Sequence, residues 1–174
     1  ANLTTSTAEY REWNTRLPPG NLSCNGSWDK AVSKGSPMEN RKVKRKLVAI
    51  FSADAKDYSR LMADDEIETV TAIKACRELI FQKILDHHGR VVDSPGDNLL
   101  AQFPSVNDSV ACAVTVQTAL LERNKDLAYH RKMEFRIGVN LGDIIEDGQQ
   151  IYGDGINIAA RIEGIAQGGG ICIS

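Results

Sequence analysis

The chain has 174 residues, of which 42% are hydrophobic and 25% are charged, and its formal net charge is −2. This composition is typical of a globular protein, and the length favours one domain with a real core. The small net charge argues against a general nucleic-acid-binding protein, and no run of about 18 apolar residues suggests a membrane span.

The four cysteines are far apart and form no CxxC pair, and three of them lie among apolar residues. Such cysteines are usually buried free thiols. The three histidines show no spacing typical of zinc ligands, and the N-terminus lacks the apolar region of a secretory signal. We therefore expect a reduced protein of the cytoplasm, without structural zinc.

Residues 1–37 differ in composition from the rest of the chain. They are rich in Ser, Thr, Asn, Gly and Pro and have no sustained apolar period, which predicts a flexible segment outside the folded domain. Residues 38–45 form a basic lead-in that begins at Met38, a plausible alternative start. A solvated approach to the first strand is the favoured interpretation of this basic run, and contact with anionic lipid or nucleic acid is the alternative.

The first half of the domain reads as a strand, a helix and a hairpin. Residues 47–51 are apolar on both faces, as in a central buried strand. Apolar residues then recur at three- and four-residue steps from Ile67 to Ile84, which predicts a helix that ends at Gly89. Residues 90–93 and 99–103 read as two strands joined by a turn, and so as a hairpin.

The second half begins with a helix capped by Ser105, with one largely apolar face made of Val106, Val110, Ala113, Val114, Gln117 and Leu121. Residues 133–141 alternate between apolar and polar, which predicts a strand with one face in the core. A short helix over about residues 156–166 and a strand at 171–173 follow. This order predicts an α+β fold with a ferredoxin-like split βαβ core, an antiparallel sheet with helices on one face.

Two aspartates follow elements of this predicted sheet. Asp54 ends the first strand, and Asp97 lies in the turn of the hairpin. If the hairpin pairs beside the first strand, the two carboxylates meet at one edge of the sheet, where such hard oxygen ligands would suit Mg²⁺ or Mn²⁺. The alternative makes Asp97 a turn former and Asp54 a strand-ending cap, and position alone favours that alternative.

Two further groups of residues could bind phosphate. The segment after Asp54 turns sharply into a helix, and its backbone amides could hold phosphate oxygens. These candidate phosphate-binding residues are Lys56, Asp57, Tyr58 and Ser59. Asn157 and Arg161 are four residues apart on one helix face and could grip a polyanion. Alternatively, they form a solvated face with Glu163 as partner.

Four blocks of sequence together resemble the class III adenylate and guanylate cyclases. They are, in chain order, residues 51–59, 96–97, 136–139 and 153–161. The order and spacing match the motifs of that family, and the last block is the most distinctive. Residues 46–174 are therefore identified as a nucleotide cyclase catalytic domain of the bacterial type, a lyase that makes a 3′,5′-cyclic nucleotide.

The resemblance implies roles for individual residues. In this family two metal ions are held by two aspartates and a backbone carbonyl, which match Asp54, Asp97 and the carbonyl of Ala55. Two Mg²⁺ or Mn²⁺ ions would lower the pKa of the ribose 3′-hydroxyl and hold the triphosphate, so that the hydroxyl attacks the α-phosphorus and pyrophosphate leaves. The family's transition-state pair matches Asn157, which would orient the ribose, and Arg161, which would stabilise charge on the α-phosphate.

The resemblance also implies an assembly. Family members work as head-to-tail dimers, with the metal ligands from one chain and the Asn/Arg pair from the other. A chain that carries both sets would form a homodimer with two equivalent sites.

Two positions that specify the purine in this family depart from its adenylate cyclase pattern. A lysine is usual where this chain has Asp93, and an aspartate is usual where it has Gln150. An acid such as Asp93 could accept from guanine, and Gln150 can donate or accept. We expect ATP as the substrate, with GTP as the alternative.

A different class of function also remains. The family domain normally continues with a hairpin whose lysine contacts the triphosphate, and this sequence ends at Ser174. That difference, with Asp93 and Gln150, motivates a catalytically weak nucleotide-binding module for regulation or dimerisation. The presence of Asp54, Asp97, Asn157 and Arg161 favours the enzyme. An RNA-binding domain of the same fold class would need exposed aromatic residues on its central strands, and this sequence offers few candidates.

Overall fold

The structure is a computed structural model that describes residues 44–147 and 150–174. The predictions for residues 1–37 and 38–43 lie outside the described residues. The strands are β1 (Lys44–Ala55), β2 (Arg90–Asp93), β3 (Asn98–Phe103), β4 (Phe135–Asp147), β5 (Gln150–Tyr152) and β6 (Ile171–Ile173). The helices are α2 (Tyr58–Asp64), α3 (Glu66–Asp86), α4 (Val106–Asn124), the 3₁₀ turn η1 (Tyr129–Arg131) and α5 (Asp154–Ile165).

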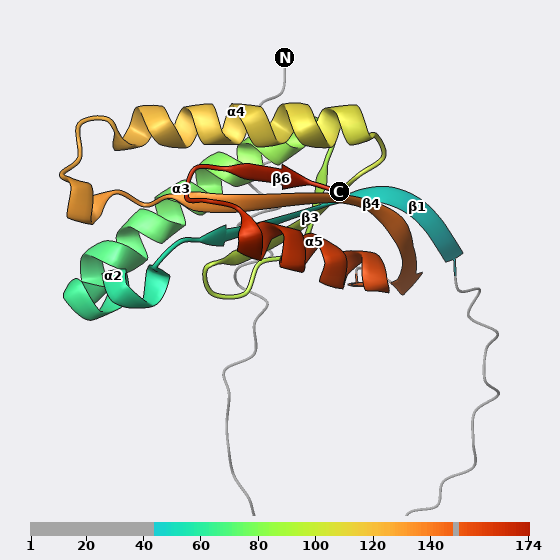
Figure 1. Cartoon of the computed structure of the whole chain (residues 1–174), viewed down its shortest axis with the longest axis horizontal. Coiled ribbons are helices and arrows are strands. Elements are labelled where there is room, and N and C mark those ends of the chain that lie inside the picture. Colours follow the sequence, from blue (N-terminus) through green and yellow to red (C-terminus); the bar gives the residue numbers. More distant parts are fainter. Residues whose placement is uncertain (1–43, 148–149) are drawn as a thin grey trace, which may run out of the picture. The chain divides into compact units, whose positions relative to one another are not determined.

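The strands form one sheet in the order β2-β3-β1-β4-β5, and β6 pairs with β4 (Figure 1). All pairs are antiparallel except β4 with β6, which is parallel. The succession of β1, α3, β2, β3, α4 and β4 is the split βαβ arrangement. The predicted α+β fold class is confirmed, and every predicted strand is present.

The central strand β1 is buried on both faces. Ala49, Phe51 and Ala53 face the larger core, and Ile50 faces a smaller one on the other side of the sheet. Alternation along a strand places successive side chains on opposite faces, so a run apolar at every position suits a strand covered on both sides.

Helices α3 and α4 cover the first face of the sheet (Figure 1). The stripe of α3 is buried as predicted from Ile73 to Ile84, but Ile67 in the first turn is 83% exposed. Thr69 is buried there instead, because its hydroxyl donates to the Leu61 carbonyl oxygen at 2.9 Å and ties α3 to α2. No helix of the described residues has the length and apolar character that crossing a bilayer requires.

Helix α4 begins as predicted, since the Ser105 hydroxyl accepts from the Asp108 amide. Its predicted face is right at Val106, Val110 and Ala113, which lie in or against the core. It is wrong at Val114 and Leu121, which are exposed, whereas Val116 and Leu120 are buried. Apolar residues occur on two sides of this helix, so the period alone could not choose between them.

Two of the predicted free thiols, Cys76 and Cys112, are fully buried, and Cys172 is half-buried. Cys24 lies outside the described residues. Burial raises the pKa of the Cys112 thiol to about 12, so it stays protonated and behaves as a small apolar side chain.

The prediction that the helices lie on one face of the sheet holds for α3 and α4 but not for α5. Helix α5 packs on the opposite face, where Ile50, Ile144 and Ala159 form the second cluster (Figure 1). Gly138 on β4 makes this approach possible, since a Cβ there would lie 2.4 Å from the Ala159 carbonyl oxygen and 2.5 Å from the Glu163 amide. Without a side chain at Gly138, the helix backbone rests directly on the sheet.

We predict that Gly138→Val destabilises the domain by about 1–3 kcal/mol, because the added side chain must push α5 off β4. Urea unfolding followed by circular dichroism measures this difference. Gly164→Ala in α5 is the matched control, since a Cβ there meets nothing within 4 Å and alanine favours the helix. Equal stability of the two variants would contradict the close approach of α5.

Candidate active site

The register of three strands gathers charged groups at the end of β1. Asp54 lies opposite Asn98 on β3 and opposite Arg136 on β4. Asp97 directly precedes Asn98, so the β2–β3 turn carries its carboxylate to that of Asp54. Burial, and then the charge of Asp54, raise the pKa of Asp97, while its own backbone amide and Arg136 oppose this shift. The structure therefore brings together the two aspartates that the sequence placed at one edge.

Arg136 supplies the positively charged side chain of this site. Its guanidinium forms an ion pair with Asp54 and donates to the Gly164 carbonyl oxygen of α5 at 3.5 Å. Its Nε is buried without a hydrogen-bond partner among the described residues. Arg136 thus links β4, β1 and α5. The sequence marked it only as part of a motif and assigned it no role.

Glu163 contributes a third carboxyl group. It is only 5% exposed, and the Ser52 hydroxyl donates to its Oε2 at 2.6 Å. Burial, and in addition the neighbouring Asp54, raise the pKa of Glu163 to about 7, although the Ser52 hydrogen bond and Arg136 lower it.

The alternative for Asn157 and Arg161 is therefore wrong about Glu163, which is buried against Ser52 and is not their partner, although both residues do lie on an exposed face. Glu163 is eight residues after Gly155 and four after Ala159, both buried, which places all three on the inner face of α5. In the sequence, this spacing shows only that Glu163 shares a helix face with two small residues, and the burial of that face depends on its contact with Gly138.

Asn157 and Arg161 lie on the opposite, exposed face of α5. No hydrogen bond or ion pair within the described part of the chain joins either of them to Asp54 or Asp97. The start of α5 is attached to β4, because Asn140 Nδ2 donates to the Gly155 carbonyl oxygen at 2.9 Å. Ser174 in turn donates to Asn140 Oδ1 at 2.6 Å. The pair is thus held on a fixed helix and faces outward.

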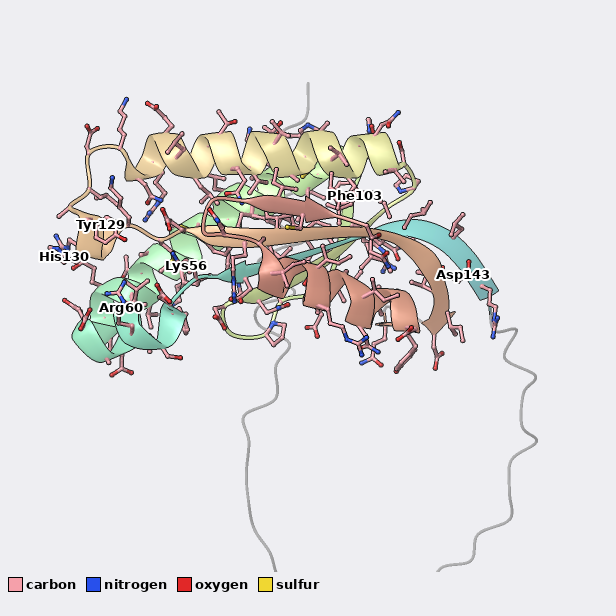
Figure 2. The ribbon with its side chains drawn as sticks, in the orientation of Figure 1. Lys56, Arg60, Phe103, Tyr129, His130 and Asp143 are labelled. Carbon is pink, nitrogen blue, oxygen red and sulfur yellow. The ribbon has the colours of Figure 1, made fainter. Side chains whose placement is uncertain are left out.

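The predicted phosphate-binding segment is only partly available. The Lys56 amide donates to the Glu134 carbonyl oxygen at 2.8 Å, so this amide is already occupied. Asp57 has a left-handed backbone, with φ of 56°, and precedes Tyr58 and Ser59 in the first turn of α2. Amides of a first helical turn have no carbonyl partner within the helix. Figure 2 shows Lys56 and Arg60 at the left of the view, where β1 leads into α2.

The two positions predicted to specify the purine lie on strands at the two ends of the sheet order, Asp93 on β2 and Gln150 on β5. Asp93 Oδ1 accepts from the Ser94 amide at 2.8 Å, so one carboxylate oxygen is bound to its own turn. Gln150 Oε1 accepts from the Tyr152 hydroxyl at 2.5 Å. Each side chain keeps further polar atoms for a ligand: the second Asp93 oxygen and the Gln150 amide nitrogen.

The donor set at the end of β1 suits a hard divalent cation. Two converging carboxylates repel each other, and a cation between them would remove that repulsion. The Ala55 carbonyl belongs to the next residue of the same strand end. Carboxylate and carbonyl oxygens are the ligands of Mg²⁺ and Mn²⁺, which fill their remaining positions with water or phosphate oxygen.

The fold and the acidic site together define a nucleotide cyclase domain. Residues 41–174 match the family described as adenylate and guanylate cyclase catalytic domain, and the chain belongs to this family.

Named relatives agree with this assignment. The chain is 42% identical over 138 residues to "Putative adenylate cyclase 3" of Rhizobium meliloti, a match that covers 79% of this chain and 24% of that protein. It is also similar to an adenylate/guanylate cyclase/hydrolase of Silicibacter pomeroyi, with 38% identity and a TM-score of 0.71 over 76% of this chain and 77% of that one.

Other solved structures share the fold at lower identity. The guanylyl cyclase Cya2 is 24% identical, with a TM-score of 0.67 over 76% of each chain. The chain spans only 24%, 15% and 42% of the lengths of the first three curated relatives.

Glu163 makes stability depend on pH. Its pKa of about 7 in the folded chain exceeds the ordinary 4.5, so the folded state holds a proton that the unfolded state releases between these values. The stabilisation is complete below about pH 4.5 and is lost as the pH rises through 7. Glu163→Gln keeps an acceptor for Ser52 and does not titrate.

We predict that, without metal, the original chain loses stability relative to Glu163→Gln between about pH 5 and pH 8, by on the order of 1–3 kcal/mol. Denaturant unfolding across this range provides the comparison. Parallel pH profiles for the two chains would contradict a raised pKa of Glu163.

Proposed function

We propose that this domain is an adenylate cyclase that converts ATP to 3′,5′-cyclic AMP and pyrophosphate for intracellular signalling. The observation that supports this most directly is the convergence of Asp54 and Asp97 beside Arg136 at the end of β1. Family membership and the relatives named as adenylate cyclases support the same reaction. The bond from the ribose 3′-oxygen to the α-phosphorus forms as the bond to the pyrophosphate oxygen breaks, and the hydroxyl proton is released.

Asp54, Asp97 and the Ala55 carbonyl would hold two Mg²⁺ or Mn²⁺ ions. When bound, such ions supply Lewis acidity for the 3′-hydroxyl and positive charge for the triphosphate. The residues around them set the charge of the site. Arg136 neutralises part of the acidic charge at Asp54, and a protonated Glu163 adds none. The net negative charge that attracts cations therefore comes from the two aspartates, and a protonated Glu163 does not add to it.

The amides at the start of α2, from Asp57 to Ser59, would bind phosphate oxygens, and Lys56 would add a positive side chain beside them. Asn157 would orient the ribose, and Arg161 would stabilise the charge that develops on the α-phosphate. Both are exposed on α5 and are not joined to the aspartates of their own chain by any hydrogen bond or ion pair of the described residues. This supports a head-to-tail homodimer, in which the pair completes the site of the partner.

GTP is the second candidate substrate. Asp93 replaces the usual lysine, and its second carboxylate oxygen could accept from guanine, while the Gln150 amide nitrogen could donate to the guanine carbonyl. A third candidate is a nucleotide-binding module with little turnover. Because relatives are named as adenylate cyclases, we favour ATP over GTP as the substrate, and an enzyme over a binding module.

We predict that the purified chain with Mn²⁺ makes cyclic AMP from ATP, and little cyclic GMP from GTP, when the two are assayed separately by chromatography. Asp54→Asn keeps the shape but removes the carboxylate charge, so we expect at least about a 100-fold loss of product. The exposed Asp143→Asn variant on β4 is a control that should retain activity.

Cyclic GMP as the main product would instead make Asp93 a guanine-binding residue. Nucleotide binding without either product would contradict the enzyme and favour the regulatory module. Product that persists in Asp54→Asn would contradict the assigned metal ligand.

A further inference from the structure

Arg77, on α3, is hydrogen-bonded to the turn that carries Asp97. Its Nη1 donates to the Gly96 carbonyl oxygen at 2.9 Å. Its Nη2 donates to both the carbonyl oxygen and the hydroxyl of Ser94, each at 2.5 Å. One planar guanidinium thus binds three acceptors of the same turn, a pattern that the single ammonium of lysine cannot reproduce.

The Gly96 carbonyl belongs to the peptide group that joins Gly96 to Asp97. Its oxygen accepts from Arg77, and its nitrogen is the backbone nitrogen of Asp97. Holding the plane of this peptide therefore restrains the backbone of Asp97, from which the carboxylate extends. Gly96 has φ of 58°, and a glycine gives a turn more conformational freedom than any other residue. Such a turn benefits from an external restraint.

Ser94 extends the same network to the strand beside Asp54. Its hydroxyl accepts from Arg77 and donates to the Asn98 carbonyl oxygen at 3.3 Å. Asn98 lies opposite Asp54 in the pairing of β1 with β3. Arg77 is therefore linked, through one serine, to the position that sets the distance between the two aspartates.

The two aspartates differ in how firmly they are held. Asp54 lies within β1, whose backbone pairs on both sides, with β3 and with β4. Asp97 lies in the turn between β2 and β3, outside the backbone pairing of both strands. Without a restraint the turn would relax away from Asp54, and a cation would have to draw it back at a cost in affinity.

We propose that Arg77 is a positioning residue for the cation site, which holds the β2–β3 turn so that the Asp97 carboxylate stays beside that of Asp54. The proposal rests on the proposed function in one respect, that these two aspartates are the cation ligands. Residues that orient metal ligands typically change metal affinity by about 10- to 100-fold when removed. The competing explanation is that Arg77 only ties α3 to the hairpin and contributes stability.

The test is to measure Mn²⁺ binding by the full chain, without nucleotide, with electron paramagnetic resonance as the readout. We expect Arg77→Met to weaken Mn²⁺ binding by roughly 10-fold, Arg77→Lys to weaken it less, and Asp97→Asn to weaken it most. Lys74→Met is the matched control, because Lys74 is an exposed basic residue of the same helix, and it should leave binding unchanged. Circular dichroism of each variant establishes that it is folded.

Amide hydrogen exchange gives a second measurement that needs no metal. Arg77→Met should speed exchange at the Asn98 amide, which donates to the Pro95 carbonyl oxygen at 3.0 Å across the turn. Ser94→Ala should have a smaller effect, since Arg77 then keeps both carbonyl acceptors.

If Arg77→Met only lowers the melting temperature, with Mn²⁺ affinity and Asn98 exchange equal to those of Lys74→Met, the proposal is overturned. If the original chain and Asp97→Asn bind Mn²⁺ equally weakly, the assignment of Asp97 as a metal ligand is contradicted. Amide exchange at Asn98 then decides whether Arg77 restrains the turn. Faster exchange in Arg77→Met would then support the restraint of the turn, and unchanged exchange would overturn it.

Discussion

The register of β1 between β3 and β4 is the constraint on which the site depends. It sets Asp54 opposite Asn98 on one side and opposite Arg136 on the other. The first pairing brings the turn with Asp97 to Asp54, and the second supplies the ion pair. A slip of one residue would move Asp54 to the other face of the sheet and separate these groups. Burial of β1 on both faces makes such a slip costly.

The charge balance at this end of the sheet follows from that register. Three carboxyl groups and one guanidinium share a partly buried space, where like charges cannot all ionise without cost. The Arg136 ion pair with Asp54 and the Ser52 hydrogen bond to Glu163 reduce this cost. The raised pKa values of Asp97 and Glu163 reduce it further, because they favour the uncharged forms. A bound cation would complete this balance, so the same residues that lower the stability of the empty site would favour metal binding.

Local patterns sufficed to predict much of this arrangement. The end of an apolar strand and a Pro-Gly-Asp turn are visible over a few residues, so the proximity of Asp54 and Asp97 could be predicted from the hairpin. Their role as metal ligands stays a prediction.

Other features depend on contacts between distant segments and could not be read locally. The Arg136 ion pair needs the register of β1 with β4, which are far apart in the chain. The burial of Glu163 and the placement of α5 need the bare backbone of Gly138 as a packing surface. Apolar residues on two sides of α4 likewise left its buried face undecided until the sheet was known.

The most direct measurement mixes two inactive chains. Asp97→Ala lacks a proposed metal ligand, and Arg161→Ala lacks the proposed transition-state residue, so neither homodimer has a complete site. If each site combines the aspartates of one chain with the exposed α5 pair of the other, the mixed dimer contains one intact site. We predict no cyclic nucleotide from either variant alone and clear recovery, up to about a quarter of the original activity for random pairing, in the mixture. No recovery, with mixed dimers demonstrated by differential tags, would contradict a site shared between two chains.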